Sequence, residues 1–315
     1  MAITISGIHH VTAISGRPQE NMAFYSELLG LRIVKVTVNF DDPTSYHIYY
    51  GDASARPGTL MTFFFWPGAR LARRGTGEAN RVTFAIPPAS LGYWQSRLKA
   101  AGTTSAMVAA DHGSSAALQF TDTEGLPLAL TESADLPPDE SHRLGTVPQE
   151  HAIGRIWGID LHVKDFNASR RHLTDVLGAT TVAQREGRVS LRLGTGGWAG
   201  AIGLTASVAG EQMGRLGAGA IHHVAWRVAT AEDQDLWRQR LDMSGLHVTP
   251  PMERVYFRSI YYREPGGVLF ELATDGPSFT VDESVEQLGT QLMLPPWLED
   301  QREAIAASLP PLQFS

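Results

Sequence analysis

The hydrophobic and polar positions of this chain repeat one rhythm four times: a short apolar strand, an amphipathic helix, and extended stretches that end near an acidic or glycine-rich turn. The opening strands begin near residues 8, 81, 158 and 221, and the helices follow near residues 22–29, 91–100, 170–177 and 233–243. A glycine stands just past each helix, where it can take the left-handed conformation that ends a helix. The pattern predicts an α+β protein of four similar segments.

A stretch without periodicity separates the second segment from the third. Residues 132–152 are rich in Pro, Asp, Glu and Ser, which is typical of an interdomain linker. We therefore expect a first domain at 1–135, a linker at 136–152, a second domain at 153–275 and a C-terminal extension at 276–315. In the extension, residues 298–309 predict a packing helix, because prolines stand just before and just after them.

The composition favours work on small molecules. The 315 residues carry 26 basic and 33 acidic side chains, a formal charge of −7, with no basic run, so we expect neither nucleic acid nor an anionic membrane as partner. The absence of cysteine excludes disulfides, thiolate metal ligands and a cysteine nucleophile. The N-terminal residues do not resemble a signal peptide, and no apolar stretch is long enough to span a bilayer, so we expect a cytoplasmic protein.

A double histidine occurs twice, as His9-His10 in the first segment and His222-His223 in the fourth, and Glu271 ends the fourth segment. Two histidines and one carboxylate on separate strands suit a facial metal site, whose remaining coordination positions stay open for substrate and O₂. A lone buried histidine more often satisfies hydrogen bonds than binds a metal. Recurrence of the pair at equivalent places in two segments favours the metal site.

Strand alternation selects one histidine from each pair. Neighbouring residues of a strand point to opposite faces, and His222 shares its face with apolar residues that suit the helix-covered side. The second histidines, His10 and His223, are therefore the better metal ligands, with Glu271 as the third. The second and third segments open with Thr83 and Leu161 where a ligand histidine would stand, so we expect one site, built between the first and fourth segments.

The chain also resembles a known family. The repeat, the His-His openings and the closing Pro-Gly-Gly-Val-Leu-Phe-Glu are similar to the vicinal oxygen chelate superfamily of glyoxalases, bleomycin resistance proteins and extradiol dioxygenases, and within it to the hydroquinone-type ring-cleaving dioxygenases. Further stretches that carry the resemblance are residues 46–50, 57–62, 256–262 and 278–280. The resemblance implies four βαβββ modules paired into two vicinal oxygen chelate domains. It also implies an aromatic diol and O₂ as substrates, and it allows a homo-oligomer.

The resemblance further implies Fe(II), less often Mn(II), at His10, His223 and Glu271, and no organic cofactor. The residues that it implies near the substrate or behind the ligands are His9, Thr12, His222, Arg254 and Tyr261. Of these, Tyr261 would hydrogen-bond a substrate oxygen and Arg254 would support developing negative charge, while His9, His222 and Tyr261 are candidates for proton transfer. The placement of His9 and His222 conflicts with the alternation argument.

Three other functions stay open on the sequence. A glyoxalase-like isomerase or lyase typically has two carboxylates at the metal, and the first segment has a phenylalanine run, residues 63–65, where the second would stand. A three-ligand thiol transferase is conceivable, although such chains are usually about half as long. A non-catalytic protein that binds an aromatic compound or confers resistance to it would have lost ligands, and all three are present.

His47, in an aromatic strand, could line the cleft, although such a residue more often packs in the core.

Overall fold

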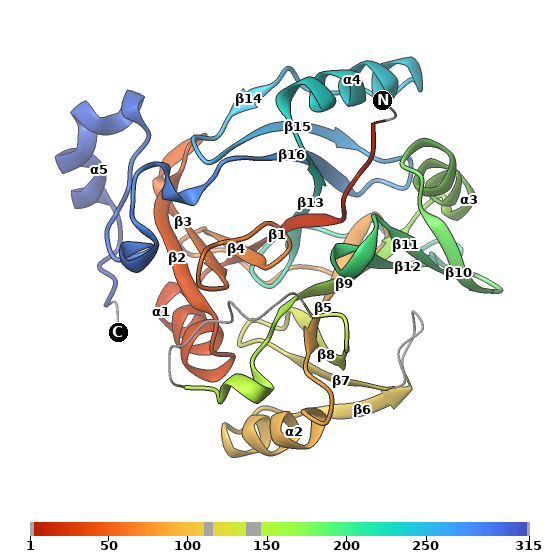
Figure 1. Ribbon diagram of the computed structural model, residues 1–315, viewed down its shortest axis with the longest axis horizontal. Helices are drawn as coiled ribbons and strands as arrows, with labels where there is room; N and C mark the ends of the chain where they lie inside the picture. The colour runs from red at the N-terminus through yellow and green to blue at the C-terminus, as the bar shows by residue number, and fades with distance from the viewer. Residues whose placement is uncertain (1–2, 110–115, 137–145, 314–315) are drawn as a thin grey trace.

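The computed structural model describes residues 3–109, 116–136 and 146–313. In these residues the strands form two sheets of eight (Figure 1). The first, the outer-segment sheet, has the order β14-β15-β16-β13-β1-β4-β3-β2. Its strands are β1 (Ile8–Ser15), β2 (Arg32–Asn39), β3 (Asp42–Gly51), β4 (Leu60–Phe65), β13 (Ile221–Val228), β14 (Met252–Glu253), β15 (Phe257–Arg263) and β16 (Leu269–Pro277).

The second, the inner-segment sheet, has the order β10-β11-β12-β9-β5-β8-β7-β6. Its strands are β5 (Glu78–Ile86), β6 (Ala106–Ala109), β7 (Ala116–Thr121), β8 (Pro127–Glu132), β9 (Arg155–Val163), β10 (Thr180–Arg185), β11 (Arg188–Leu193) and β12 (Gly200–Ala206). Each segment contributes a strand, a helix and three further strands, so the expected α+β fold of four βαβββ modules in two sheets is confirmed.

The modules pair differently from their order along the chain. Strand β1 pairs antiparallel with β13, so the first and fourth modules share one sheet, and β5 pairs antiparallel with β9, so the second and third share the other. Each sheet therefore takes strands from both sides of the expected linker at 136–152, and the sheets do not coincide with the expected domains 1–135 and 153–275. Residues 137–145 of that linker lie outside the described residues.

Helices form where the apolar rhythm predicts them. They are α1 (Pro18–Met22) with the π-helical η1 (Ala23–Leu28), α2 (Leu91–Ala100), α3 (Phe166–Arg171) with the π-helical η3 (His172–Val176), and α4 (Ala231–Met243). The side chain of Thr230 accepts the backbone N–H of Asp233 and so caps the start of α4. Gly30 has φ +73° and Gly178 has φ +84°, the conformation expected of a residue that ends a helix.

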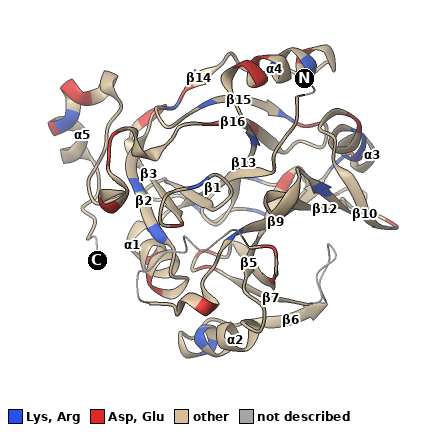
Figure 2. Cartoon of the chain, viewed as in Figure 1, with Lys and Arg blue, Asp and Glu red and all other residues tan. Residues whose placement is uncertain are grey.

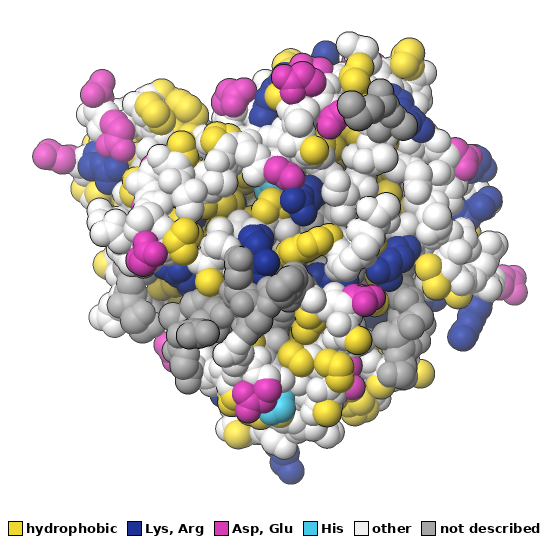
Figure 3. Space-filling model, viewed as in Figure 1, with side chains coloured by type: hydrophobic (Ala, Val, Ile, Leu, Met, Phe, Trp, Pro, Cys, Tyr) yellow, Lys and Arg dark blue, Asp and Glu magenta, His cyan; other side chains and the backbone are white. Residues whose placement is uncertain are grey.

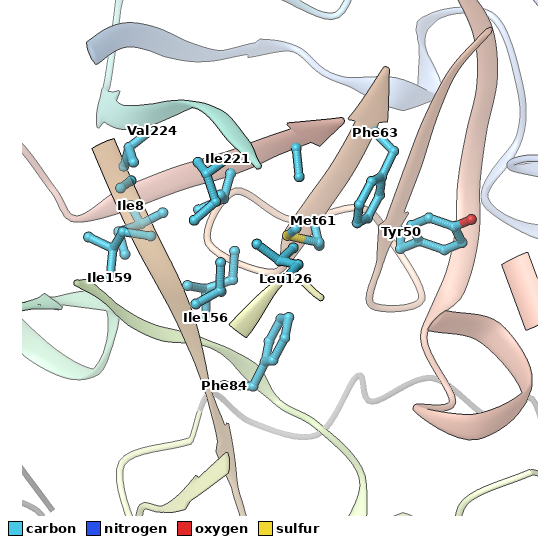
Figure 4. Close-up of a cluster of buried hydrophobic side chains, with 14 of the residues drawn as sticks. Ile8, Tyr50, Met61, Phe63, Phe84, Leu126, Ile156, Ile159, Ile221 and Val224 are labelled. Carbon is cyan, nitrogen blue, oxygen red and sulfur yellow. The ribbon is translucent and has the colours of Figure 1, made fainter. Parts of the chain in front are cut away.

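The core lies between the two sheets and beneath the helices. Figure 4 shows Ile8, Met61 and Ile221 of the outer-segment sheet beside Phe84 and Ile156 of the inner-segment sheet. Trp226 of β13 belongs to the same cluster and so does Trp237 of α4, and both are buried. This packing leaves the remaining face of β1, β13 and β16 for the polar residues of the site.

The C-terminal extension packs along β2 and β3 (Figure 1). Met293 donates its backbone N–H to the carbonyl of Val36 at 2.9 Å, and the buried ammonium of Lys35 contacts Asp282 at 2.6 Å and also Glu283. Instead of the single helix expected at 298–309, a 3₁₀ helix η7 (Pro296–Gln301) leads into a short α5 (Arg302–Ser308). The extension thus covers β2, an edge strand of the sheet that carries the site.

Charged residues are spread over the helices, strands and loops (Figure 2). On the face shown in Figure 3, basic and acidic side chains are interspersed. Among the described residues, none of the helices has the length and apolar character needed to cross a bilayer.

Candidate metal centre and substrate pocket

Two β-bulges place the double histidines. Along the β1–β13 pair, Ile8 lies opposite Trp226 but His10 lies opposite Ala225, so His9 is an extra residue in β1. A second shift, between Thr12 and Ala13, leaves His222 as an extra residue in β13. A bulge interrupts the alternation of side chains and re-aims them locally. Both rings of each pair can therefore turn toward the same region.

The side chains of His10, His223 and Glu271 meet between β1, β13 and β16. The Nε2 atom of His223 lies 2.9 Å from Oε2 of Glu271, and Nε2 of His10 lies 3.3 Å from the same oxygen. The two Nε2 atoms are 3.3 Å apart, and one ligand atom from each residue lies within 4.8 Å of the others. All three residues are buried. The structure thus brings together the three residues that the sequence predicts as metal ligands.

Hydrogen bonds behind the ligands orient the imidazole of His10. The Nε2–H of His9 donates to the carbonyl of Thr274 at 3.1 Å, which leaves Nδ1 of a neutral His9 as an acceptor. His10 donates to it from Nδ1 at 2.9 Å, so Nε2 of His10 carries a lone pair aimed at Glu271. The Nδ1 atoms of His222 and His223 are 2.8 Å apart. If His223 donates from Nδ1 to His222, as His10 does to His9, Nε2 of His223 also carries a lone pair. Such outer hydrogen bonds fix the tautomer of a metal-binding histidine.

The carboxylate of Glu271 suits a cation. Its Oε1 accepts the hydroxyl of Ser259 at 2.5 Å, whereas its fully buried Oε2 has no hydrogen-bond donor among the described residues. An ionised oxygen without a donor, beside two imidazole nitrogens, is a donor set that fits Fe(II) or Mn(II).

The alternation argument is wrong for His9 and His222. It places the first histidine of each pair on the helix-covered face, but the bulges turn each one beside its ligand neighbour, with ring centroids 5.1 Å apart in both pairs. His9 packs against Phe257, and His222 against Phe64. Neither lines the pocket described below. Both touch the candidate ligand histidines, which places them behind the candidate metal site.

A pocket opens in front of His10 and His223. Its space, including the open mouth, is about 340 Å³. Its walls are formed by His10, Asn39, Phe40, Asp41, His47, Tyr49, Phe64, His223, Arg254, Phe257 and Tyr261. Aromatic rings dominate these walls, which suits a planar aromatic ligand.

Arg254 and Tyr261 line the pocket, as the resemblance implies. Both nitrogens of the Arg254 fork donate to the Asp41 carboxylate, at 2.9 and 3.2 Å, and the guanidinium lies 5.6 Å from the Tyr261 ring centre. Tyr261 lies opposite Glu271 across β15 and β16, and its ring centre is 5.7 Å from that of His223. Burial first, and then the charge of Glu271, raise the pKa of Tyr261, so its phenol stays protonated and can donate a hydrogen bond.

The register corrects the expected counterpart of Glu271 in the first module. Glu271 lies opposite Ala225, two residues after His223, and Thr62 lies opposite Thr12, two residues after His10. The equivalent residue is therefore Thr62 and not a phenylalanine of the run at 63–65. The sequence shows the run but not its register against β1. A neutral hydroxyl thus stands where an isomerase of the glyoxalase type would have its second carboxylate.

Several lining residues were not predicted. His47 lines the pocket rather than the core. Thr12 does not line the pocket and is linked to it through hydrogen bonds: its hydroxyl lies 2.8 Å from that of Thr62, which lies 2.9 Å from Nε2 of His47. The unpredicted lining residues are Asn39, Phe40, Asp41, Tyr49, Phe64 and Phe257. The aromatic stretch at 46–50 was the available signal for His47 and Tyr49.

The family of the chain follows from comparison with known proteins. The model of the family described as "Glyoxalase/Bleomycin resistance protein/Dioxygenase superfamily" matches residues 7–130 and 155–272. The chain belongs to this superfamily. The expected resemblance is thereby confirmed, and the matched ranges include all three candidate ligands.

Similar proteins cover the whole chain. "Putative ring-cleaving dioxygenase MhqE" of Bacillus subtilis (strain 168) is 42% identical over 308 residues, 97% of this chain and 99% of that protein. "Chlorohydroquinone/hydroquinone 1,2-dioxygenase" of Sphingobium indicum is 30% identical over 316 residues, 97% of this chain and 96% of that protein. A crystal structure described as "putative dioxygenase from Bacillus subtilis subsp. subtilis str. 168" has a TM-score of 0.93 and 37% identity, covering 99% of each chain.

Proposed function

We propose that this protein is a ring-cleaving dioxygenase that opens an aromatic diol of the hydroquinone type with O₂, using Fe(II) or, less often, Mn(II). The metal would be held by His10, His223 and Glu271. The observation that carries the proposal is the buried Oε2 of Glu271, which lacks a hydrogen-bond donor and lies within 3.3 Å of both Nε2 atoms. The names of the similar proteins, a ring-cleaving and a hydroquinone dioxygenase, support the reaction class.

A bound Fe(II) would supply the redox chemistry between O₂ and an aromatic ring, since a facial set of three protein ligands leaves coordination positions open for both. The protein has to orient the ring and exclude bulk water. Phe40, Phe64 and Phe257 provide flat apolar contacts, and the ligand residues themselves are buried at the base of the pocket. A ring held between these walls would present one oxygen to the ligand face.

Polar groups at the wall would control charge and protons. Tyr261 is adjacent to His223 and keeps its proton, so it would donate a hydrogen bond to a substrate oxygen near the metal face. Arg254 lines the pocket with its side chain 15% exposed, and its positive charge would stabilise negative charge that develops on the ring oxygens. His9 and His222 would act through the ligand histidines that they orient.

The alternative isomerase reaction is disfavoured by one observation. A second carboxylate at the metal would serve that reaction as its base, and the equivalent residue here is Thr62, whose hydroxyl is bonded to Thr12 and His47. A neutral hydroxyl is a far weaker base than a carboxylate.

The test is O₂ consumption by protein that has been purified anaerobically and loaded with Fe(II). We expect one O₂ per ring opened on a panel of hydroquinones and catechols, with hydroquinones preferred, and no turnover by Glu271→Gln. A panel that consumes no O₂, together with isomerisation of 2-oxoaldehyde–thiol adducts, would replace the dioxygenase proposal by the isomerase.

A further inference from the structure

A chain of four hydrogen-bonding side chains runs from behind the metal site to the pocket wall. The hydroxyls of Thr12 and Thr62 are 2.8 Å apart, and Thr62 lies 2.9 Å from Nε2 of His47. The other ring nitrogen of His47, Nδ1, lies 3.0 Å from the phenol oxygen of Tyr49. The proposed chemistry does not use this chain, although both His47 and Tyr49 line the pocket.

The buried end of the chain sets its direction. Thr12 is fully buried, and its hydroxyl has Thr62 as its one side-chain partner in the described part of the protein. If Thr62 donated to Thr12, the proton of Thr12 would be left without an acceptor, at a cost of about 1–3 kcal/mol. Thr12 therefore donates to Thr62, and Thr62 donates to Nε2 of His47.

His47 carries this direction on to Tyr49. Burial first, and then the nearby His10 and His223, hold the pKa of His47 well below its usual range, so its ring is neutral and has one N–H. With Nε2 accepting from Thr62, that hydrogen lies on Nδ1 and is donated to the phenol oxygen of Tyr49. The O–H of Tyr49 then has no acceptor among these four side chains and is available to the pocket.

The phenol of Tyr49 is held one layer away from the metal ligands. Its ring packs against His47, Tyr256 and Phe279, with centroid separations of 4.1, 6.5 and 5.1 Å. In the described residues no ring contact joins Tyr49 to a ligand histidine, in contrast to Tyr261 with His223. Tyr49 lies opposite Thr62 across β3 and β4, just as Tyr261 lies opposite Glu271 across β15 and β16. The pocket thus has two phenols at equivalent strand positions, of which only Tyr261 contacts a candidate ligand histidine.

We propose that Tyr49 donates a hydrogen bond to the diol oxygen that the metal does not hold, and so selects substrates with a second hydroxyl. This inference rests on the proposed function, because it assumes that the pocket holds a diol. Thr62 and His47 are positioning residues, since they act by directing the Tyr49 proton into the pocket.

The test is anaerobic calorimetric binding of hydroquinone and of phenol to the Fe(II)-loaded protein. Tyr49→Phe is expected to weaken hydroquinone binding about tenfold, the equivalent of one hydrogen bond, and to leave phenol binding and metal content unchanged. The matched control is Tyr50→Phe, the next residue of the same strand, whose buried hydroxyl donates to Asn21 at 2.9 Å and does not line the pocket. It should change neither affinity.

Thr62→Val provides a second readout of the same chain. Without the Thr62 donor, Nε2 of His47 loses its partner, either ring nitrogen can carry the hydrogen, and Tyr49 can turn its proton toward His47. Hydroquinone affinity should fall by about two- to fivefold, less than in Tyr49→Phe, with phenol again unaffected.

The outcomes separate the two proposals. If the wild-type protein opens hydroquinone but Tyr49→Phe binds it as tightly as the wild type does, or weakens phenol equally, the role of Tyr49 is overturned and the dioxygenase function stands. If the wild-type protein neither binds nor oxidises any diol, the proposed function fails, and the inference about Tyr49 fails with it.

Discussion

Thr62 and Glu271 occupy equivalent positions in the two halves of the outer-segment sheet. Each lies on the strand parallel to a double-histidine strand, opposite the residue two places after a ligand histidine. Each also has a side-chain hydrogen bond to the next strand: Thr62 donates to His47, and Glu271 accepts from Ser259. The site is therefore symmetric in its backbone but carries a carboxylate on one side only.

A second carboxylate at this position should strengthen metal binding and lower the proposed dioxygenase activity. Thr62→Glu would put an anionic oxygen opposite Glu271, so we expect divalent metal to bind at least about tenfold more tightly, equivalent to 1.4 kcal/mol. Diol-dependent O₂ uptake should fall sharply, because a coordination position needed by substrate or O₂ is filled. Competition with a chelator measures the affinity. Thr62→Gln, of the same shape without the charge, is the control and should not tighten metal binding.

Much of this site is visible in the sequence. The double histidine that recurs at matching places in a repeated pattern, with a carboxylate ending the fourth segment, predicts His10, His223 and Glu271 as candidate metal ligands. Helix ends and opening strands follow from glycines and apolar periodicity, which are local signals. The family match to residues 7–130 and 155–272 agrees with that repeat.

The features of the site that the sequence does not show depend on the register between paired strands. Alternation cannot reveal the bulges that insert His9 and His222, since a bulge is a property of the pairing between two strands. The equivalence of Thr62 with Glu271 likewise needs the alignment of β4 against β1. The pairing of the first module with the fourth is a long-range choice between strand edges. The matching double histidines predict that these two modules meet, whereas the apolar periodicity carries no information about their pairing.

Removing the Ser259 hydroxyl should weaken metal binding without unfolding the protein. Ser259 donates to Oε1 of Glu271 at 2.5 Å and so orients the carboxylate. Loss of a partner of this kind typically lowers metal affinity by about 10- to 100-fold, and we expect Ser259→Ala to do so. The control is Ser169→Ala, because Ser169 is an equally buried serine that donates to another buried carboxylate, Glu264, at 2.6 Å. Equal metal affinity in both variants would contradict an orienting role for Ser259.

Acid should destabilise the protein through His172. Burial lowers the pKa of His172 to about 4, and its Nε2 lies 3.0 Å from the Tyr262 hydroxyl. The unfolded chain, with a histidine pKa near 6.5, binds the proton first, so the free energy of unfolding falls as the pH falls from about 6.5 to 4. The contribution is at most about 3 kcal/mol.

Urea unfolding of the metal-free protein at pH 7 and pH 5 checks this dependence. In His172→Gln, whose amide can still accept from Tyr262, stability should change less between the two pH values than in the wild type. His247→Gln removes an exposed histidine and should leave the wild-type difference intact. Identical pH dependence in His172→Gln and the wild type would show that His172 does not contribute.

A fragment comprising residues 1–140 should neither fold cooperatively nor bind metal. It holds β1 to β8, which are half of each sheet, and it lacks His223 and Glu271. Strands β1 and β5 would lose their partners β13 and β9 and expose unpaired backbone groups along one edge. Co-expression with residues 141–315 should restore both sheets and one metal per complex, which metal analysis after co-purification measures. Cooperative unfolding and wild-type metal affinity in the isolated 1–140 fragment would contradict the pairing of the first module with the fourth.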